Sequence, residues 1–535
     1  MLRQGLVLFT LTLIPPAAPA AVSARPNIFV ILTDDVGWGD FQCYNPSGKI
    51  SSPNVDRLAR EGMRFTHAHT PAALCAPTRY SMLTGNYPWR GRAPGGTWGF
   101  NVPAQMLPGQ RTVANFLQEA GYRTAMFGKS GIGGQHALKA DGQPDFTQPM
   151  LDGPKRWGFD YSFIIPRGHQ TTPHLFLENE RPSVDPNRLV RGQGQKKAKG
   201  AAAAAADYAE PGWDPAQLGE RLLGAAEKFL DDVLAQNQAS DGHAPFFMHF
   251  CTDGAHSPYV PAETIRGIIL KDQTKMTAHT DMVHETDVLL GQLMQLLERR
   301  GLLADTLICF TSDNGGIPAE QHLGHDAVGG LRGLKSYMPE GGHRVPFLVR
   351  WPGKIPAGTV RNQVVCTHDI VATALELAGV RLPAGQCQDA VSLVPVLTGR
   401  RDDTQPVRQN LLVQSSPGRD AFDDGGIKGG LLTGKEAKRD TRKLFGNEPD
   451  TDGKAGKRQL KKSGPTSDGM AHALYDGDWK LTLDIRDDPV ALYDLKTDLV
   501  ESTNLIGNPA QAERVKAMGK VYREIRATKN SATTP

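Results

Sequence analysis

Short apolar runs of strand length recur along the chain, and polar or turn-forming residues bound each of them. The runs lie at residues 27–32, 122–127, 246–250 and 307–311. Continuous apolar runs of this kind are typical of strands that are buried on both faces. We therefore predict that these segments are core strands.

Segments with helical spacing of apolar residues separate these runs. They are 55–61, closed by Gly62, a helix capped by Thr112 that runs through Ala120, and the segments 218–234 and 282–297. The last two place their apolar side chains on one face of a helix. Alternation of strands and helices predicts an α/β fold with a mostly parallel central sheet flanked by helices.

The length and composition fit a large folded protein. The chain has 535 residues, of which 39% are hydrophobic and 22% are charged. This is enough for one large α/β domain and a smaller appended domain. The formal net charge is only +3, so the whole chain gives no reason to expect nucleic acid as a partner.

Residues 1–24 have the pattern of a secretory signal peptide. Arg3 precedes an apolar stretch at 6–14, and small residues before Arg25 offer a cleavage site. The stretch is too short for a membrane span, which needs roughly 20 residues, and no later segment approaches that length without charges. We expect a secreted or periplasmic protein with no membrane span.

Polar side chains follow several of the predicted strands. They are Asp34 and Asp35, Lys129, His256, Asp313 and Asn314. Ligands bind at the carboxyl ends of parallel strands, so we expect these side chains to share one site. Three carboxylates and an amide oxygen suit Ca²⁺ or Mg²⁺ better than zinc, and a bound cation explains how the carboxylates coexist.

Five motifs occur in an order that is typical of one family. They are R-P-N-I-F-V-I-L-T-D-D at 25–35, C-A-P-T-R at 75–79 followed by S-M-L-T-G at 81–85, F-T-S-D-N-G-G at 310–316, L-R-G-L-K at 331–335 and E-G-G-H-R-V-P at 340–346. From about Arg25 to the C-terminus the chain resembles the type I sulfatases.

That resemblance implies an alkaline-phosphatase-like fold. The catalytic domain would span 25–405, and a smaller C-terminal α+β subdomain built on an antiparallel sheet would span 406–535. Within the subdomain, residues 474–481 and 492–495 look like hairpin strands of the family.

The resemblance also implies a modified cysteine. Cys75 would be oxidised to formylglycine by a formylglycine-generating maturation enzyme. One hydroxyl of the aldehyde hydrate attacks sulfur to give a covalent sulfate ester, and the other later loses its proton and expels sulfate. The metal, Ca²⁺ in the family's manner with Mg²⁺ acceptable to the same ligands, would be held by Asp34, Asp35, Asp313, Asn314 and the modified Cys75.

Four further residues receive catalytic roles by the same resemblance. Arg79 and Lys129 supply positive charge around the hydrate, while Lys335 and His256 contact sulfate and protonate the leaving oxygen. The predicted function is an exported sulfatase that acts on a sulfated carbohydrate or polysaccharide. Two alternatives are a phosphoric or phosphonic ester hydrolase of the same superfamily and a non-catalytic sulfoglycan-binding relative.

One departure from the family pattern concerns the base for sulfate release. The family has G-K-W-H after the second strand, whereas this chain has Gly131 where the histidine is expected. His136, His169 and His325 lie in loops near a motif, and each is a candidate replacement.

Loops after the motif strands supply the candidate substrate-binding residues. They are Arg90, Arg92, His169, His174 and His325, with Trp98 and Arg167 beside them. Cations, imidazoles and aromatic rings suit sulfated sugars, and loops usually determine specificity.

The predicted C-terminal subdomain contains a basic loop at about 416–468. Its segment 428–462, called the basic arm below, has 11 Lys and Arg against 5 Asp and Glu. It is either a solvated loop or an arm that attracts a sulfated polysaccharide.

Six cysteines remain to be assigned. With Cys75 reserved for modification, five are left, so at least one thiol stays free or pairs between chains. We predict a disulfide between Cys366 and Cys387.

Overall fold

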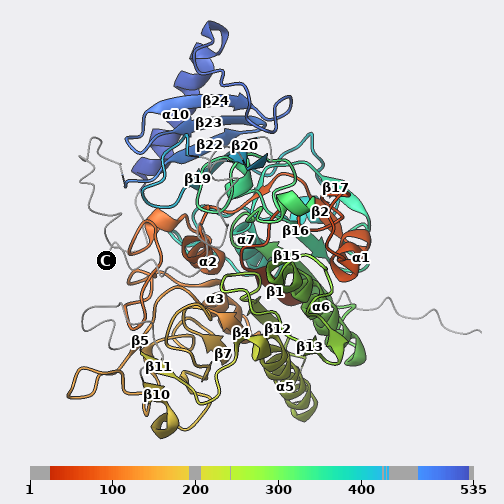
Figure 1. Ribbon diagram of the computed structural model, residues 1–535, viewed down its shortest axis with the longest axis vertical. Helices are drawn as coiled ribbons and strands as arrows, with labels where there is room; N and C mark the ends of the chain where they lie inside the picture. The colour runs from red at the N-terminus through yellow and green to blue at the C-terminus, as the bar shows by residue number, and fades with distance from the viewer. Residues whose placement is uncertain are drawn as a thin grey trace, which may run out of the picture.

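A computed structural model shows a large central sheet between two layers of helices, with a second, smaller sheet at one end (Figure 1). The described residues are 25–191, 207–240, 243–423, 427–428, 431–432 and 468–528. The predicted signal peptide and the side chains of the basic arm lie outside these residues.

The central sheet has ten strands in the order β17-β2-β16-β15-β1-β12-β4-β7-β8-β9. Its parallel centre is formed by β15 (Thr306–Ser312), β1 (Asn27–Thr33), β12 (Phe246–Cys251), β4 (Arg123–Lys129) and β7 (Tyr161–Ile165). The outer strands are β17 (Thr359–Arg361), β2 (Met63–Phe65), β16 (Phe347–Arg350), β8 (Leu177–Glu178) and β9 (Arg181–Pro182). The four predicted core strands are confirmed, and the α/β fold class with them.

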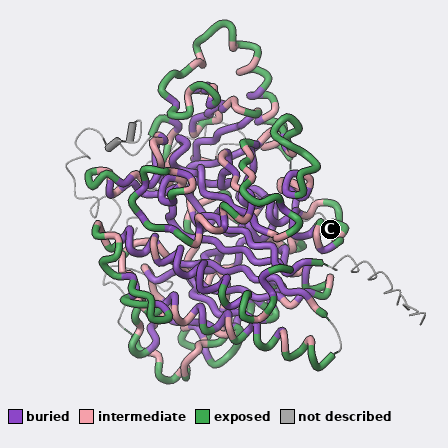
Figure 2. The backbone as a smooth tube through the Cα atoms, turned by 90° about the vertical axis from the view of Figure 1, so that its right-hand side faces the viewer, coloured by how far each residue is buried: buried purple, intermediate pink, exposed green. Residues whose placement is uncertain are grey.

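The side chains of β1 alternate between two core layers, as the pleat of a strand requires. Ile28, Val30 and Leu32 join the cluster on one face of the sheet, while Phe29 and Ile31 join the cluster on the other. The strand is therefore buried on both sides, and the buried centre of the molecule follows the sheet (Figure 2).

Helices cover both faces of the sheet. On the Phe29 side lie α1 (Pro53–Glu61), α5 (Leu218–Ala239) and α6 (Ala278–Arg299), and on the other side lie α2 (Cys75–Thr84), α3 (Val113–Glu119) and α7 (Asp369–Leu377). The predicted helices correspond to α1, α3, α5 and α6. Thr112 caps α3, because its hydroxyl accepts a hydrogen bond from the backbone N–H of Asn115.

Adjacent parallel strands bring the predicted site residues together. β15, β1, β12 and β4 are consecutive in the sheet, so their carboxyl ends form one edge. Asp34 follows β1, Lys129 ends β4, His256 lies beyond β12 and Asp313 follows β15. Side chains far apart in sequence thus meet at this edge of the sheet.

The smaller sheet is antiparallel, as predicted for the C-terminal part. It comprises β19 (Asn410–Gln414), β22 (His472–Asp476), β23 (Trp479–Leu483) and β24 (Pro489–Asp494), in this order. α10 (Ala512–Ala527) packs against it through Met518 and Tyr522. β22 and β23 form the hairpin expected at 474–481.

The predicted disulfide between Cys366 and Cys387 is wrong, because both thiols are free. Cys366 lies in β18 (Val365–Cys366), which pairs with β3 (Ala68–His69). Cys387 lies in a loop and packs instead against Gly85 at the end of α2. The two cysteines are therefore fixed by different neighbours.

In the part of the chain that the structure describes, no helix has both the length and the apolar character required to cross a membrane.

Candidate active site

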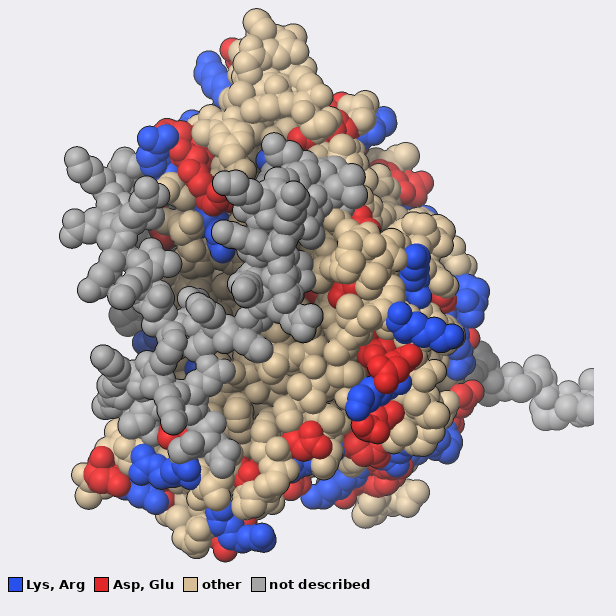
Figure 3. Space-filling model, in the orientation of Figure 1, with Lys and Arg blue, Asp and Glu red and all other residues tan. Residues whose placement is uncertain are grey.

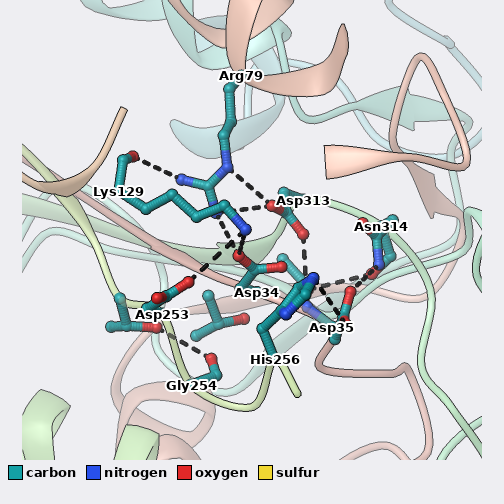
Figure 4. A network of polar contacts seen from close by, with 12 residues as sticks. Asp34, Asp35, Arg79, Lys129, Asp253, Gly254, His256, Asp313 and Asn314 are labelled. Carbon is teal, nitrogen blue, oxygen red and sulfur yellow. Dashed lines mark hydrogen bonds and ion pairs between the residues drawn. The ribbon is translucent and has the colours of Figure 1, made fainter. Parts of the chain in front are cut away.

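Three buried carboxylates meet at the carboxyl edge of the central sheet (Figure 4). The Asp35 backbone N–H donates to Oδ1 of Asp313 over 3.4 Å. The Asn314 amide donates to Oδ1 of Asp35 over 2.9 Å. The backbone N–H of Asp34 donates to the Gly254 carbonyl beyond β12 over 3.1 Å. Loops after three neighbouring strands therefore fix the carboxylates.

A buried arginine and two lysines neutralise these carboxylates. Nη2 of Arg79 lies 2.6 Å from Asp313 and 3.2 Å from Asp34. Lys129 forms an ion pair with Asp34, and Nζ of Lys335 lies 2.5 Å from Oδ1 of Asp35. The formal charges of the three cations and three carboxylates cancel.

Burial acts to raise the pKa of both Asp34 and Asp313, whereas nearby positive charges act to lower it. Burial alone would raise the pKa of Asp34, but Lys129 and Arg79 outweigh it and hold that pKa well below its usual range. Burial and the neighbouring Asp34 raise the pKa of Asp313 to about 7. A further positive charge beside Asp313 would lower its pKa again and favour full ionisation.

Cys75 is the first residue of α2, and its side chain faces the carboxylates. One ligand atom each of Asp34, Cys75 and Asp313 lies within 4.8 Å of the others. Arg79 lies one helical turn after Cys75, so the helix presents both side chains to the same place. Burial raises the pKa of the Cys75 thiol, although Lys129 and Lys335 oppose this.

The donor set fits a divalent hard cation. Oδ1 of Asp34 and Oδ1 of Asn314 are buried oxygens that have no hydrogen-bond partner within the described part of the chain, and such atoms cost free energy unless something binds them. The other available donors are carboxylate oxygens of Asp35 and Asp313. An all-oxygen set of this kind suits Ca²⁺ or Mg²⁺, and the site holds the Cys75 side chain beside it.

His256 borders the carboxylates from the loop after β12. Its Nδ1 donates to the Ser257 carbonyl over 2.6 Å, which leaves Nε2 facing Asp35 at 3.9 Å. Burial, followed by the charges of Lys335 and Lys129, lowers the pKa of His256 to about 4. A negative charge between His256 and these lysines would raise that pKa and let Nε2 carry a proton.

Gly131 occupies the position where the family pattern has a histidine, so no side chain enters the site from there. Its backbone is left-handed with φ of +66°, and a Cβ there would lie 3.2 Å from Cδ of Arg79. Space and backbone conformation therefore both favour glycine here.

Of the three candidate replacements, only His169 joins the network around Lys129. Its Nδ1 lies 2.6 Å from Oδ2 of Asp253, and its Nε2 donates to the Pro258 carbonyl over 2.8 Å. Oδ1 of Asp253 lies 3.6 Å from Nζ of Lys129. Burial alone would lower the pKa of His169, but Asp253 outweighs it and raises that pKa. Both ring nitrogens are thus engaged.

His325 and His136 lie in other surroundings. His325 is buried and hydrogen-bonded to Asp40 over 2.9 Å. His136 packs against Phe100 and Phe146, at ring distances of 5.7 and 4.9 Å. Neither histidine contacts the carboxylates through a described hydrogen bond or ion pair.

The remaining predicted substrate residues are also spread out. Nε of Arg90 lies 2.7 Å from Asp389, in a buried ion pair that commits its guanidinium. Arg92 is exposed and donates to the Ala104 carbonyl over 3.1 Å. His174 stacks on Trp213 with ring centroids 5.5 Å apart.

Asp253 is the site residue that sequence reasoning missed. It lies two residues after the end of β12, where it contacts both Lys129 and His169. The rule that led to Asp34 and Asp313, namely an acidic residue after a core strand, would also have found Asp253.

Comparisons with known proteins identify the family of the chain. A family model described as Sulfatase matches residues 26–380. The chain is 31% identical to N-acetylgalactosamine-6-O-sulfatase from Bacteroides thetaiotaomicron over 425 residues, covering 73% of this chain and 80% of that protein. It is also 31% identical to human arylsulfatase A over 509 residues, covering 93% and 86% of the two chains.

A solved structure from work on glycosaminoglycan metabolism by Bacteroides thetaiotaomicron shares the fold. It has a TM-score of 0.72 at 23% identity and covers 95% of this chain and 100% of its own. The family model and the relatives lead to one conclusion: the chain belongs to the sulfatase family and is a sulfuric ester hydrolase.

Proposed function

We propose that this protein is an exported, formylglycine-dependent sulfatase that acts on sulfated carbohydrates. The observation that carries the proposal is the position of Cys75. Its side chain lies with Asp34 and Asp313 in a group of possible metal-ligand atoms. The positive charges of Lys129 and Lys335 favour a negative charge on residue 75, because they oppose the rise in its pKa that burial causes. A nucleophile made from this residue would adjoin both a cation site and the groups that bind sulfate.

The charge of the site supports an anionic substrate. Arg79, Lys129 and Lys335 cancel the charges of Asp34, Asp35 and Asp313, and Asp253 beside Lys129 adds one negative charge, so a divalent cation in the oxygen site would still leave a surplus of positive charge. Buried surplus charge attracts a counter-ion strongly, because little water screens it. A sulfate ester carries the negative charge that such a site requires.

The modified residue would supply the chemistry that a thiol lacks. As a hydrated aldehyde, residue 75 would offer one hydroxyl to attack sulfur and a second to expel sulfate, while the cation would lower the hydroxyl pKa. Arg79 binds Asp34 and Asp313 and fixes the carboxylate frame. Lys129 and Lys335 border Cys75 and are suited to bind developing negative charge.

His256 is the proposed proton donor to the leaving oxygen. The hydrogen bond from Nδ1 to Ser257 directs Nε2 toward the site. A substrate sulfate would offset the positive charge of Lys335 and Lys129, which together with burial holds the pKa of His256 low. Nε2 could then carry the proton that the leaving alkoxide needs.

The substrate class and export rest on separate observations. One relative is named for an N-acetylgalactosamine 6-O-sulfate group, which supports a sulfated sugar as the substrate. Residues 1–24 have the sequence of a signal peptide, which supports export.

The proposal can be tested by measuring turnover of matched esters. The protein would be co-expressed with a formylglycine-generating enzyme and assayed on 4-nitrophenyl sulfate, 4-nitrophenyl phosphate and N-acetylgalactosamine 6-sulfate. We expect the sulfates to be hydrolysed in preference to the phosphate, and Cys75→Ala to abolish turnover. Cys43→Ala, which removes a thiol elsewhere, is the control. Preference for phosphate, or binding without turnover, would contradict the proposal.

A further inference from the structure

Arg167 differs from the other cations of the site because it has no ion-pair partner among the described residues. Arg79, Lys129 and Lys335 are each in an ion pair with a carboxylate. The guanidinium of Arg167 is half-buried, and among the described residues it has neither an ion pair nor a side-chain hydrogen bond. A partly desolvated cation without a counter-ion is costly, so the position suits an anionic ligand.

Backbone contacts fix Arg167 at the edge of the active site. Its neighbour Pro166 accepts hydrogen bonds from the Gly131 N–H over 3.0 Å and from the Ser130 hydroxyl over 2.9 Å. On the other side, Gly168 has φ of +108°, and a Cβ there would lie 2.9 Å from Asp253. The loop is therefore held against both the Lys129 segment and Asp253.

Arg167 lies outside the carboxylate cluster. Burial lowers its pKa, and Cys75 is the one described ionisable group whose charge acts on it in return. Pro166 accepts hydrogen bonds from Gly131 and Ser130, next to Lys129, so an anion at Arg167 would lie beside the proposed binding place of the scissile sulfate.

The loop beyond Arg167, together with Trp213 that stacks on it, carries polar atoms that lack partners among the described residues. Oε1 of Gln170, Oγ1 of Thr171, Nε2 of His174 and Nε1 of Trp213 are buried without a hydrogen bond in the described structure. Buried polar atoms are rarely left unpaired unless a ligand or water completes them. His174 and Trp213 stack with an interplanar angle of 7°, so Trp213 holds the end of this loop in place.

We propose that Arg167 and the loop through His174 form a subsite for a second anionic group, a sulfate or carboxylate, on the sugar that carries the scissile sulfate. Arg167 would bind this group, and Gln170 and Thr171 would bind sugar hydroxyls. The inference rests on the proposed function and narrows its substrates to sugars with two negative groups. Guanidinium binds sulfate and carboxylate through paired hydrogen bonds, so lysine is a poorer substitute.

The test compares two sugars that differ in one charge. N-acetylgalactosamine 6-sulfate and N-acetylgalactosamine 4,6-disulfate would be assayed with the wild type, Arg167→Ala and Arg167→Lys, alongside 4-nitrophenyl sulfate. Arg167→Ala should reduce kcat/KM on the disulfate by about 10- to 100-fold, chiefly through KM, because it removes a charged hydrogen-bonded contact. The other two substrates should change by less than about threefold. Arg156→Ala, which removes an arginine side chain that is 69% exposed, is the matched control.

Equal losses on all three substrates would overturn the inference, because they would place Arg167 on the scissile sulfate. No loss on any substrate would also overturn it. Isothermal titration calorimetry of the two sugars with unmodified protein measures binding without turnover. It therefore tests the subsite separately from the proposed sulfatase activity. Absent turnover would contradict sulfatase activity, whereas tighter binding of the disulfate that Arg167→Ala removes would still support the subsite.

Discussion

At the scale of single residues, the candidate active site is a set of opposed buried charges, and we propose that a cation completes it. Arg79, Lys129 and Lys335 neutralise the carboxylates but leave oxygens of Asp34 and Asn314 without partners. The unpaired oxygens, rather than an excess of negative charge, support the proposed metal position. Stability and function should therefore both depend on the cation.

Removal of divalent cations should lower the melting temperature and abolish turnover. Ca²⁺ should restore both in the wild type, because a ligand that binds only the folded state stabilises it. In Asp35→Asn the Ca²⁺-dependent rise in melting temperature should be much smaller, as one anionic ligand is lost. Differential scanning fluorimetry with chelator and with Ca²⁺ measures this. Asp231→Asn, on the surface of α5, is the control, and an unchanged Ca²⁺ effect in Asp35→Asn would contradict the assignment.

The proposed role of His256 predicts a dependence on the leaving group. A sugar alkoxide needs a proton when it leaves, whereas 4-nitrophenolate does not. His256→Gln should therefore lower kcat on N-acetylgalactosamine 6-sulfate by about 10²- to 10³-fold and on 4-nitrophenyl sulfate by less than about tenfold. Steady-state kinetics of the wild type and His256→Gln on the two substrates measure this difference in kcat. Similar losses on both would show that His256 binds the sulfate instead.

At the scale of elements, the sequence predicted best where hydrophobic pattern alone decides the structure. β1, β4, β12 and β15 are buried on both faces, and their apolar runs have no other stable placement. The strand-end rule then brought Asp34, Lys129 and Asp313 together. Long-range pairing was less predictable: the partners of Cys366 and Cys387 depend on how distant loops pack.

The partners of loop residues were also not predictable from the sequence. Arg90 and Arg167 both follow motif segments and look alike in sequence, yet one is neutralised by Asp389 and the other has no carboxylate partner among the described residues. Asp389 lies about three hundred residues from Arg90 in the chain, and no local pattern connects them. Only the folded structure separates a structural arginine from one that is available to a ligand.

Helix α6 contains a carboxyl group whose burial should make stability depend on pH. Glu285 is 8% exposed, and burial raises its pKa from 4.5 to about 7. Between these values the folded protein holds a proton that the unfolded chain has lost, so stability falls as pH rises through this window. Above it, the ionised group remains a cost to folding.

Glu285→Gln should remove this cost. The expected gain in unfolding free energy is about 1 kcal/mol at pH 5 and about 3 kcal/mol at pH 8. Glutamine can still accept the hydrogen bond from the Ala262 N–H, which now measures 3.0 Å. Chemical denaturation at both pH values tests the prediction, with the exposed Glu298→Gln on the same helix as control. A gain that does not grow with pH would contradict it.

At the scale of the whole molecule, a buried ionic network joins the two sheets. Nζ of Lys480, on β23, lies 3.0 Å from Glu340 and 2.8 Å from Glu501. Glu340 precedes β16 of the central sheet and also binds Arg344 at 2.7 Å. On the face shown in Figure 3, in contrast, Lys and Arg alternate with Asp and Glu at the surface. Surface pairs of that kind contribute little to stability.

Lys480→Ala should therefore destabilise the whole protein. It would leave Glu340 and Glu501 close together and buried, at a cost of about 3–5 kcal/mol. Urea denaturation measures the loss, and Lys496→Ala, an exposed lysine of the same region, is the control. A loss below about 1 kcal/mol would show that the network does not hold the sheets together.

The identity of residue 75 is the central claim, and the mass of the peptide that spans Cys75 tests it most directly. The protein would be taken from cells that contain a formylglycine-generating enzyme, and the same sample would be assayed for sulfate release. We predict a mass about 18 Da below that of the cysteine peptide, since the thiol is replaced by an aldehyde. An active sample in which the thiol is fully retained would contradict the mechanism.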